Sequence, residues 1–142
     1  MTLQISPEKR DQMPGLIRHP LIRLLAAGAA IGLAALIGIY SLVPASETPA
    51  PHLSDKIKHI AAYAALAAPL SVAFGRGLRP AILAFGVAAL FGIGLEIAQM
   101  LGDAGREGSL LDVAANLCGA LIGLFIVCGL GRAWPLFGRD GG

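Results

Sequence analysis

Four long stretches with few or no charged residues divide this sequence, and a chain with this pattern is limited to folds that span a membrane. The first stretch, residues 24–43, contains no charge at all. Twenty helical residues at about 1.5 Å each span about 30 Å, the thickness of the hydrocarbon core of a bilayer. The other stretches cover residues 57–74, 80–101 and 110–130. We therefore predict an all-α integral membrane bundle of four transmembrane helices.

The composition agrees with a lipid environment. Hydrophobic residues make up 56% and charged residues 14% of the 142 residues, whereas soluble domains carry about 45–50% and about 25%. The net charge of +2 is small and dispersed, which excludes a nucleic-acid surface and leaves membrane lipid as the expected partner. No cofactor motif and no metal-ligand spacing is present. Cys118 and Cys128 lie about 15 Å apart along a helix, so they cannot form a disulfide, and we expect them to be small buried hydrophobic residues.

Proline and capping residues predict where the helices begin and how the chain is divided. Pro20 should prevent a helix from starting before the first stretch. Ser54 is a suitable N-cap for the second helix, and Pro80 a suitable first residue for the third. We predict three segments: a cytoplasmic N-terminal segment over 1–23, a transmembrane domain over 24–130, and a cytoplasmic tail over 131–142.

The basic residues are distributed unevenly between the two ends of the predicted bundle. The N-terminal segment, the turn at residues 75–79 and the tail together contain eight Lys and Arg residues, and these three segments lie on one side of the membrane. The loops at residues 44–56 and 102–109, with the first residues of the second helix, contain three. The positive-inside rule therefore predicts that both termini are cytoplasmic and that the two loops face outward.

Most of the polar residues within the apolar stretches lie near the outward ends of helices two, three and four. On helix two, four of them fall within an arc of about 100° on a helical wheel. We expect the outer halves of these helices to meet and to form a ligand-binding site, whose residues are Asp55, Lys56, His59, Tyr63, Glu96, Gln99, Arg106, Ser109, Asp112 and Asn116. No residue of this set is identified as catalytic.

Glu96 is the most informative of these residues, because it lies about 7 Å of helix inside the third stretch. A carboxylate in the membrane centre costs about 3 kcal/mol or more, and such residues face protein or water. We predict that Glu96 lies close to at least one of His59, Lys56, Arg106 or Asn116. We also predict that Arg106 and Asp112 form an oriented pair. Arg106→Lys should then impair function while leaving the fold intact, because Lys lacks the planar fork of Arg.

A structural role is the alternative for the same residues. Asn, Gln, Ser and His form hydrogen bonds between membrane helices, worth about 0.6 kcal/mol each. Two pairs of glycines at four-residue spacing, Gly28/Gly32 and Gly119/Gly123, are typical of helices that approach each other closely. The polar residues would then hold the bundle together.

Three segments of the chain carry a family resemblance: DKIKHIAAY at 55–63, EIAQ at 96–99 and REGSLLDVAANLCG at 106–119. Their order and spacing resemble the VanZ-like family of small bacterial membrane proteins, which is named for a teicoplanin-resistance protein. The resemblance covers residues 54–123. It implies a multi-pass protein of the bacterial cytoplasmic (inner) membrane, linked to the cell envelope and to antibiotic resistance through glycopeptide tolerance. It implies no particular reaction.

Two hypotheses of function follow. In the first, an outward-facing pocket binds or acts on an anionic amphipathic envelope molecule, such as a lipid or a lipid-linked precursor. Cationic side chains would hold the anionic group, and Glu96 and Asp112 would orient them or accept protons. Because no activated nucleophile is recognisable, the sequence favours binding over catalysis. In the second, the chain is a non-enzymatic accessory or scaffold subunit of a homo-oligomer or a larger membrane complex. An ion path is disfavoured, because the polar residues are confined to one end.

Overall fold

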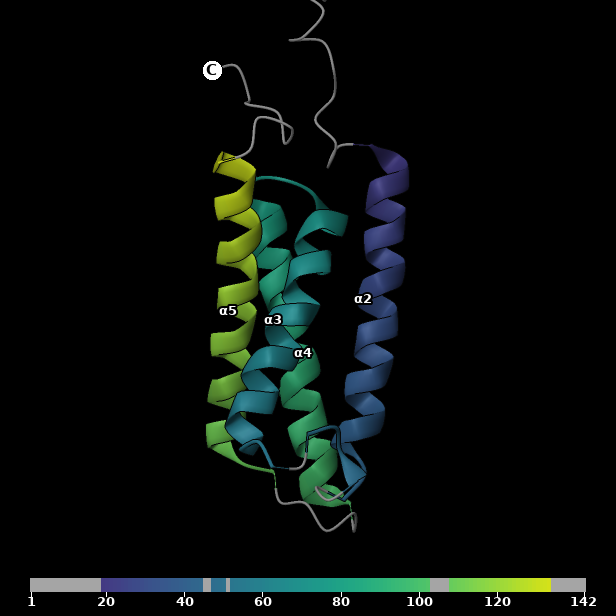
Figure 1. Ribbon diagram of the computed structural model, residues 1–142, viewed down its shortest axis with the longest axis vertical. Helices are drawn as coiled ribbons and strands as arrows, with labels where there is room; N and C mark the ends of the chain where they lie inside the picture. Colours follow the sequence, from purple (N-terminus) through teal and green to yellow (C-terminus); the bar gives the residue numbers. More distant parts are fainter. Residues whose placement is uncertain (1–18, 45–46, 51, 103–107, 134–142) are drawn as a thin grey trace, which may run out of the picture.

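The computed structural model describes residues 19–44, 47–50, 52–102 and 108–133, and these residues form four α-helices and no strand. In chain order the helices are α2 (Pro20–Ser41), α3 (Asp55–Phe74), α4 (Leu78–Leu101) and α5 (Leu110–Ala133). Successive helices run in opposite directions, as Figure 1 shows. All four are long and apolar enough to cross a membrane. The predicted all-α bundle is confirmed, and the chain is a multi-pass membrane protein.

The predicted effect of Pro20 on the start of the first helix is wrong. Instead of preventing a helix, Pro20 is the first residue of α2, four residues before the predicted start. The first N–H groups of a helix have no partner within it, so proline is tolerated there. The side chain of His19 caps this end, because its Nδ1 accepts a hydrogen bond from the N–H of Leu21 at 3.3 Å. The helix ends at Ser41, two residues before the predicted end.

The starts of α3 and α4 also depend on caps. Ser54 is the N-cap of α3, as predicted, and its Oγ accepts from the N–H of Ile57 at 3.4 Å. Pro80 is the third residue of α4 rather than the first, because the helix begins at Leu78 after Gly77. Gly77 has a φ of 115°, a conformation that glycine adopts without strain. The prolyl nitrogen still falls in the first turn, where no intrahelical hydrogen bond is lost.

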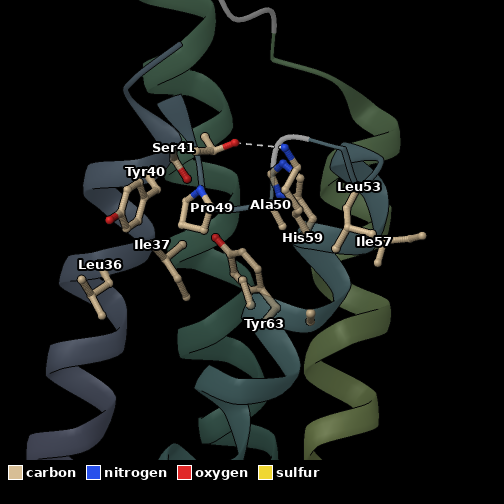
Figure 2. A pocket seen from close by; sticks show the side chains of 14 residues that line it. Leu36, Ile37, Tyr40, Ser41, Pro49, Ala50, Leu53, Ile57, His59 and Tyr63 are labelled. Atoms are coloured by element: carbon tan, nitrogen blue, oxygen red, sulfur yellow. Dashed lines mark hydrogen bonds between the residues drawn. The ribbon is translucent and has the colours of Figure 1, made fainter. Parts of the chain in front are cut away.

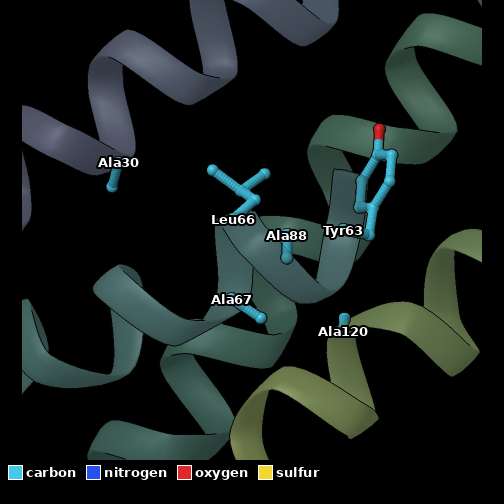
Figure 3. Close-up of a cluster of buried hydrophobic side chains, with 6 residues drawn as sticks. All are labelled: Ala30, Tyr63, Leu66, Ala67, Ala88 and Ala120. Carbon is cyan, nitrogen blue, oxygen red and sulfur yellow. The ribbon is translucent and has the colours of Figure 1, made fainter. Parts of the chain in front are cut away.

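Small residues face the interior of the bundle and large ones face outward. On α4, Ala84, Ala88 and Gly92 are buried at four-residue spacing. Figure 3 shows the central apolar cluster, in which alanines from several helices surround Leu66 and Tyr63. Leu, Ile and Phe side chains remain exposed on the outside of all four helices. This inversion of the arrangement in soluble proteins fits a chain whose solvent is lipid, where small residues permit close helix packing.

Helix α3 is the central helix and packs most extensively against α5. A Cβ added at Gly119 would collide with the carbonyl group of Ile60, and one added at Gly123 would collide with that of Ala64. The predicted close approach is therefore present for this glycine pair. It is absent for Gly28 and Gly32, because a Cβ at either position would meet nothing within 4 Å. The predicted burial of the two cysteines is also wrong: both are exposed on the surface of the bundle.

Arg23 joins α2 to α3 at one end of the bundle. Its guanidinium donates to the carbonyl oxygens of Ala73 at 2.9 Å and Phe74 at 3.2 Å. The last carbonyls of a helix lack partners within the helix, so these bonds satisfy two of them. The opposite end, where α2 and α4 end and α3 and α5 begin, is called the polar end below and lies at the bottom of Figure 1.

Candidate functional site

Three helices bring buried polar side chains together at the polar end, as the sequence predicts. His59 comes from α3, Glu96 from α4, and Asp112 and Asn116 from α5, and all four are buried. His59 Nδ1 lies 2.8 Å from Asn116 Oδ1 and 3.9 Å from Glu96 Oε1. The predicted proximity of Glu96 to a polar partner is thus confirmed. We call His59, Glu96, Asp112, Asn116, Tyr63 and Lys56 the polar cluster.

Lys56 lies at the rim of the polar cluster. Its Nζ forms a salt bridge of 2.8 Å with Asp112 Oδ1. The Lys56 side chain is 47% exposed, whereas that of Asp112 is 11% exposed. Lys56 is therefore the more exposed partner of this pair, and its long side chain reaches in from the surface to a carboxylate that is largely buried among the helices.

A main-chain N–H group holds the carboxylate of Glu96. Its Oε2 accepts a hydrogen bond of 2.9 Å from the N–H of Ser109, which comes just before α5. Ser109 thus contributes its backbone to the cluster. Its Oγ instead accepts from the N–H of Leu111 at 3.2 Å, close to the start of α5. The Glu96 carboxylate links the end of α4 to the beginning of α5.

Two donors in the polar cluster have no hydrogen-bond partner within the described part of the chain. They are the hydroxyl of Tyr63, which is 1% exposed, and Nδ2 of Asn116, which is 2% exposed. Both lie beside Gly92, because a Cβ built there would be 3.0 Å from each. Leaving such a group buried and unpaired costs about 1–3 kcal/mol. The two groups therefore mark a place where an oxygen acceptor would be held.

The remaining predicted site residues lie outside the cluster. Gln99 Nε2 donates to the carbonyl oxygen of Ser41 at 2.7 Å, a bond that ties α4 to the end of α2. Asp55 forms an ion pair of 2.8 Å with Lys58 on its own helix. Arg106 falls outside the described residues, so its pairing with Asp112 stays a prediction.

A cavity of about 390 Å³ adjoins the polar cluster. It lies between the second half of α2, residues 48–50 with Leu53, and the first half of α3. Figure 2 shows Leu36 and Ile37 on its α2 side, and Tyr63 with its hydroxyl directed toward the same end as Pro49 and His59. His59 and Tyr63 thus belong both to the polar cluster and to the wall of the cavity.

The family of the chain follows from a comparison with protein-family models. The model described as VanZ/LLP1 matches residues 26–132, which cover most of the four helices and all of the polar cluster. This chain belongs to the VanZ/LLP1 family. No curated protein and no solved structure gives a significant match.

In this VanZ/LLP1 chain, the segments that carry the resemblance supply the polar cluster. The segment at 55–63 contributes one face of α3, and those at 96–99 and 106–119 contribute the end of α4 and the start of α5. The sequence did not reveal the cavity. Its wall includes Leu36, Ile37 and Pro49, which carry no polar motif, and their spacing contains no signal that residues 48–50 would face the second half of α2 across a cavity.

Proposed function

We propose that this VanZ/LLP1 protein binds an anionic amphipathic molecule of the cell envelope, a lipid or a lipid-linked headgroup, in the cavity at the polar end. The observation that carries the proposal is the change in polarity along the cavity wall. The polar residues Thr48, Lys58 and His59 line the end nearest the loops, next to apolar residues such as Leu53. Leu36 and Ile37 line the part deeper along α2. An amphipathic molecule has the same sequence of groups, with a polar head followed by an apolar chain.

Lys58 is the cation best placed to hold the headgroup. It lines the cavity, and its side chain is 19% exposed. Its Nζ is held by Asp55 at 2.8 Å and by the hydroxyl of Thr48 at 3.0 Å. A lysine ammonium has three N–H groups, so it can donate to a phosphate oxygen in addition to these two partners. Its position is thus fixed before a ligand arrives, which lowers the entropy lost on binding.

The source of the ligand depends on which way the bundle faces. The distribution of Lys and Arg favours a polar end on the outer face of the bacterial cytoplasmic membrane. The cavity would then receive molecules from the outer leaflet, where envelope precursors are exposed. This location would also account for the link to glycopeptide tolerance, and to teicoplanin resistance in particular, that the resemblance to VanZ-like proteins implies.

Native mass spectrometry of the full chain tests the proposal. The protein is extracted gently and offered equal amounts of phosphatidylglycerol and phosphatidylcholine of the same chain length. We expect one phosphatidylglycerol to be retained preferentially. Lys58→Gln should abolish the preference, and Ile37→Trp should reduce retention of both lipids by filling the cavity. Arg79→Gln is the matched control, because it removes an equal charge from an exposed residue at the other end of the bundle. Equal retention of both lipids by the unaltered protein would contradict the proposal.

A scaffold role is the second candidate, and the bond from Gln99 to the Ser41 carbonyl favours it. That bond fastens two helices and leaves the Gln99 amide nitrogen directed at backbone rather than at a ligand. Glu96→Gln, which keeps an acceptor for the Ser109 N–H, together with Asp112→Asn and Arg106→Ala separates the two functions. A site predicts loss of glycopeptide tolerance at normal membrane abundance, whereas helix-fastening residues predict loss of the protein itself.

A further inference from the structure

The polar cluster contains three residue types that commonly bind metal ions, one from each of three helices. A ring nitrogen of His59 and one carboxylate oxygen each of Glu96 and Asp112 lie within 4.8 Å of one another, and all three residues are buried. We infer that His59, Glu96 and Asp112 bind one divalent transition-metal ion, with Zn²⁺ as the best fit. The inference does not depend on lipid binding in the adjacent cavity.

The donor atoms and their spacing fit zinc. Zn²⁺ takes imidazole nitrogen and carboxylate oxygen at about 2.0–2.2 Å, so two ligand atoms of a tetrahedral site lie about 3.4 Å apart. The distance of 3.9 Å between His59 Nδ1 and Glu96 Oε1 is close to this value, and small side-chain rotations would close the difference. In the metal-free chain His59 Nδ1 donates to Asn116 Oδ1 at 2.8 Å, so metal binding through Nδ1 would release this proton and leave the neutral Asn116 oxygen beside the ion. A single imidazole with two carboxylates suits zinc better than Mg²⁺, which prefers all-oxygen sites.

The unpaired donors of the cluster are a second, independent sign that something binds here. Tyr63 and Asn116 are each more than nine-tenths buried, and the Tyr63 hydroxyl and Asn116 Nδ2 have no partner within the described part of the chain. A zinc ion with three protein ligands keeps a fourth position for a water molecule or another oxygen. An oxygen at that position, beside Gly92, would accept hydrogen bonds from both donors.

Lys56 is the competitor of the metal ion. Its ammonium lies 2.8 Å from Asp112 Oδ1, on the carboxylate that the ion would share. Because the Lys56 side chain is nearly half exposed, it can move into the headgroup region without leaving a buried cation behind. Removing this charge should therefore strengthen metal binding. If the ion pair were purely structural, removing the Lys56 charge would destabilise the bundle and would not raise the zinc affinity.

Isothermal titration calorimetry of the full chain in detergent, stripped with a chelator, tests the inference. We expect one Zn²⁺ per chain and no measurable Mg²⁺ binding at the same concentrations. Glu96→Gln and Asp112→Asn should each weaken zinc affinity about tenfold or more, since even indirect contacts of metal ligands are worth 10–100-fold. Lys56→Gln should raise the affinity. Lys58→Gln removes an equal charge from the cavity, next to the cluster, and should leave zinc affinity unchanged.

The gain of affinity in Lys56→Gln is the decisive result, because a folding defect cannot produce it. The inference is overturned if the unaltered chain binds no zinc, if Mg²⁺ binds as tightly as Zn²⁺, or if Lys56→Gln and Lys58→Gln bind zinc equally. Lipid retention measured on the same samples tests lipid binding independently of zinc binding. Lys58→Gln should lose the preference for anionic lipid while retaining zinc, and neither result requires the other.

Discussion

At the scale of single residues, the polar end combines groups that the bundle needs for its fold with groups that it does not. Glu96 receives the N–H of Ser109, so removing its acceptor oxygens would leave a backbone donor unpaired. The Tyr63 hydroxyl, in contrast, makes no hydrogen bond within the described residues. Substitutions at these two positions should therefore change stability in opposite directions, which separates structure from ligand binding.

For Glu96 we expect Gln and Leu to differ sharply. Glu96→Gln retains an oxygen that accepts from Ser109, so the apparent melting temperature in detergent should stay close to that of the unaltered chain. Glu96→Leu leaves the Ser109 N–H buried without an acceptor, at a cost of about 1–3 kcal/mol. Thermal unfolding of the two variants at equal detergent concentration checks this. Equal loss of stability in both would show that the charge, rather than the hydrogen bond, holds the helices together.

For Tyr63 we expect Phe to raise the stability of the ligand-free chain. The change removes a buried hydroxyl that lacks a partner, and it keeps the ring that packs near Phe91, 6.4 Å away between centroids. The gain should be on the order of 1 kcal/mol. Chemical unfolding of the chelator-treated, delipidated protein is the measurement. A destabilised Tyr63→Phe variant would mean that the hydroxyl already has a partner in the free protein.

At the scale of helices, the apolar stretches predict which segments are helical, and the residues at the helix starts determine where the helices begin. Each predicted helix is present, with ends that differ by two to four residues where His19, Gly77 or Pro20 determines the first turn. The cluster was predictable because residues three or four apart share a helix face, as Lys56, His59 and Tyr63 do. The cavity could not be predicted, and neither could the absence of a close helix neighbour at Gly28 and Gly32. Both depend on which elements α2 packs against.

The two glycine pairs provide an internal comparison at this scale. Gly119→Ala places a methyl group against the Ile60 carbonyl of α3, and overpacking of this kind costs about 1–3 kcal/mol. Gly28→Ala meets open space and should be neutral or slightly stabilising, because alanine favours a helix more than glycine does. Membrane abundance and melting temperature of the two variants test the difference. A loss of stability in Gly28→Ala would indicate that another chain covers that face of α2.

At the scale of the whole molecule, the source of the proposed lipid ligand depends on which side of the membrane the polar end faces. The bundle has a clear asymmetry. Arg23 binds the end of α3 at the end of the bundle where α2 begins and α5 ends, while the cavity and the polar cluster lie at the other. In the sequence, eight of the eleven Lys and Arg residues fall within residues 1–23, 75–79 and 131–142. This distribution makes orientation a property of the sequence that an experiment on intact cells can read directly.

We expect both termini to be cytoplasmic, because Lys and Arg in short segments beside transmembrane helices are retained on that side. A fluorescent protein that matures only in the cytoplasm, fused after residue 142, should be bright. Alkaline phosphatase, which is active only outside the cytoplasm, should be inactive at the same site and active when inserted within residues 47–50. Moving the charge tests the cause: replacing the basic residues of the N-terminal segment and of the turn at 75–79 with Gln should produce a mixed population. An active phosphatase after residue 142 of the unaltered chain would reverse the orientation, and the cavity would then open to the cytoplasmic leaflet.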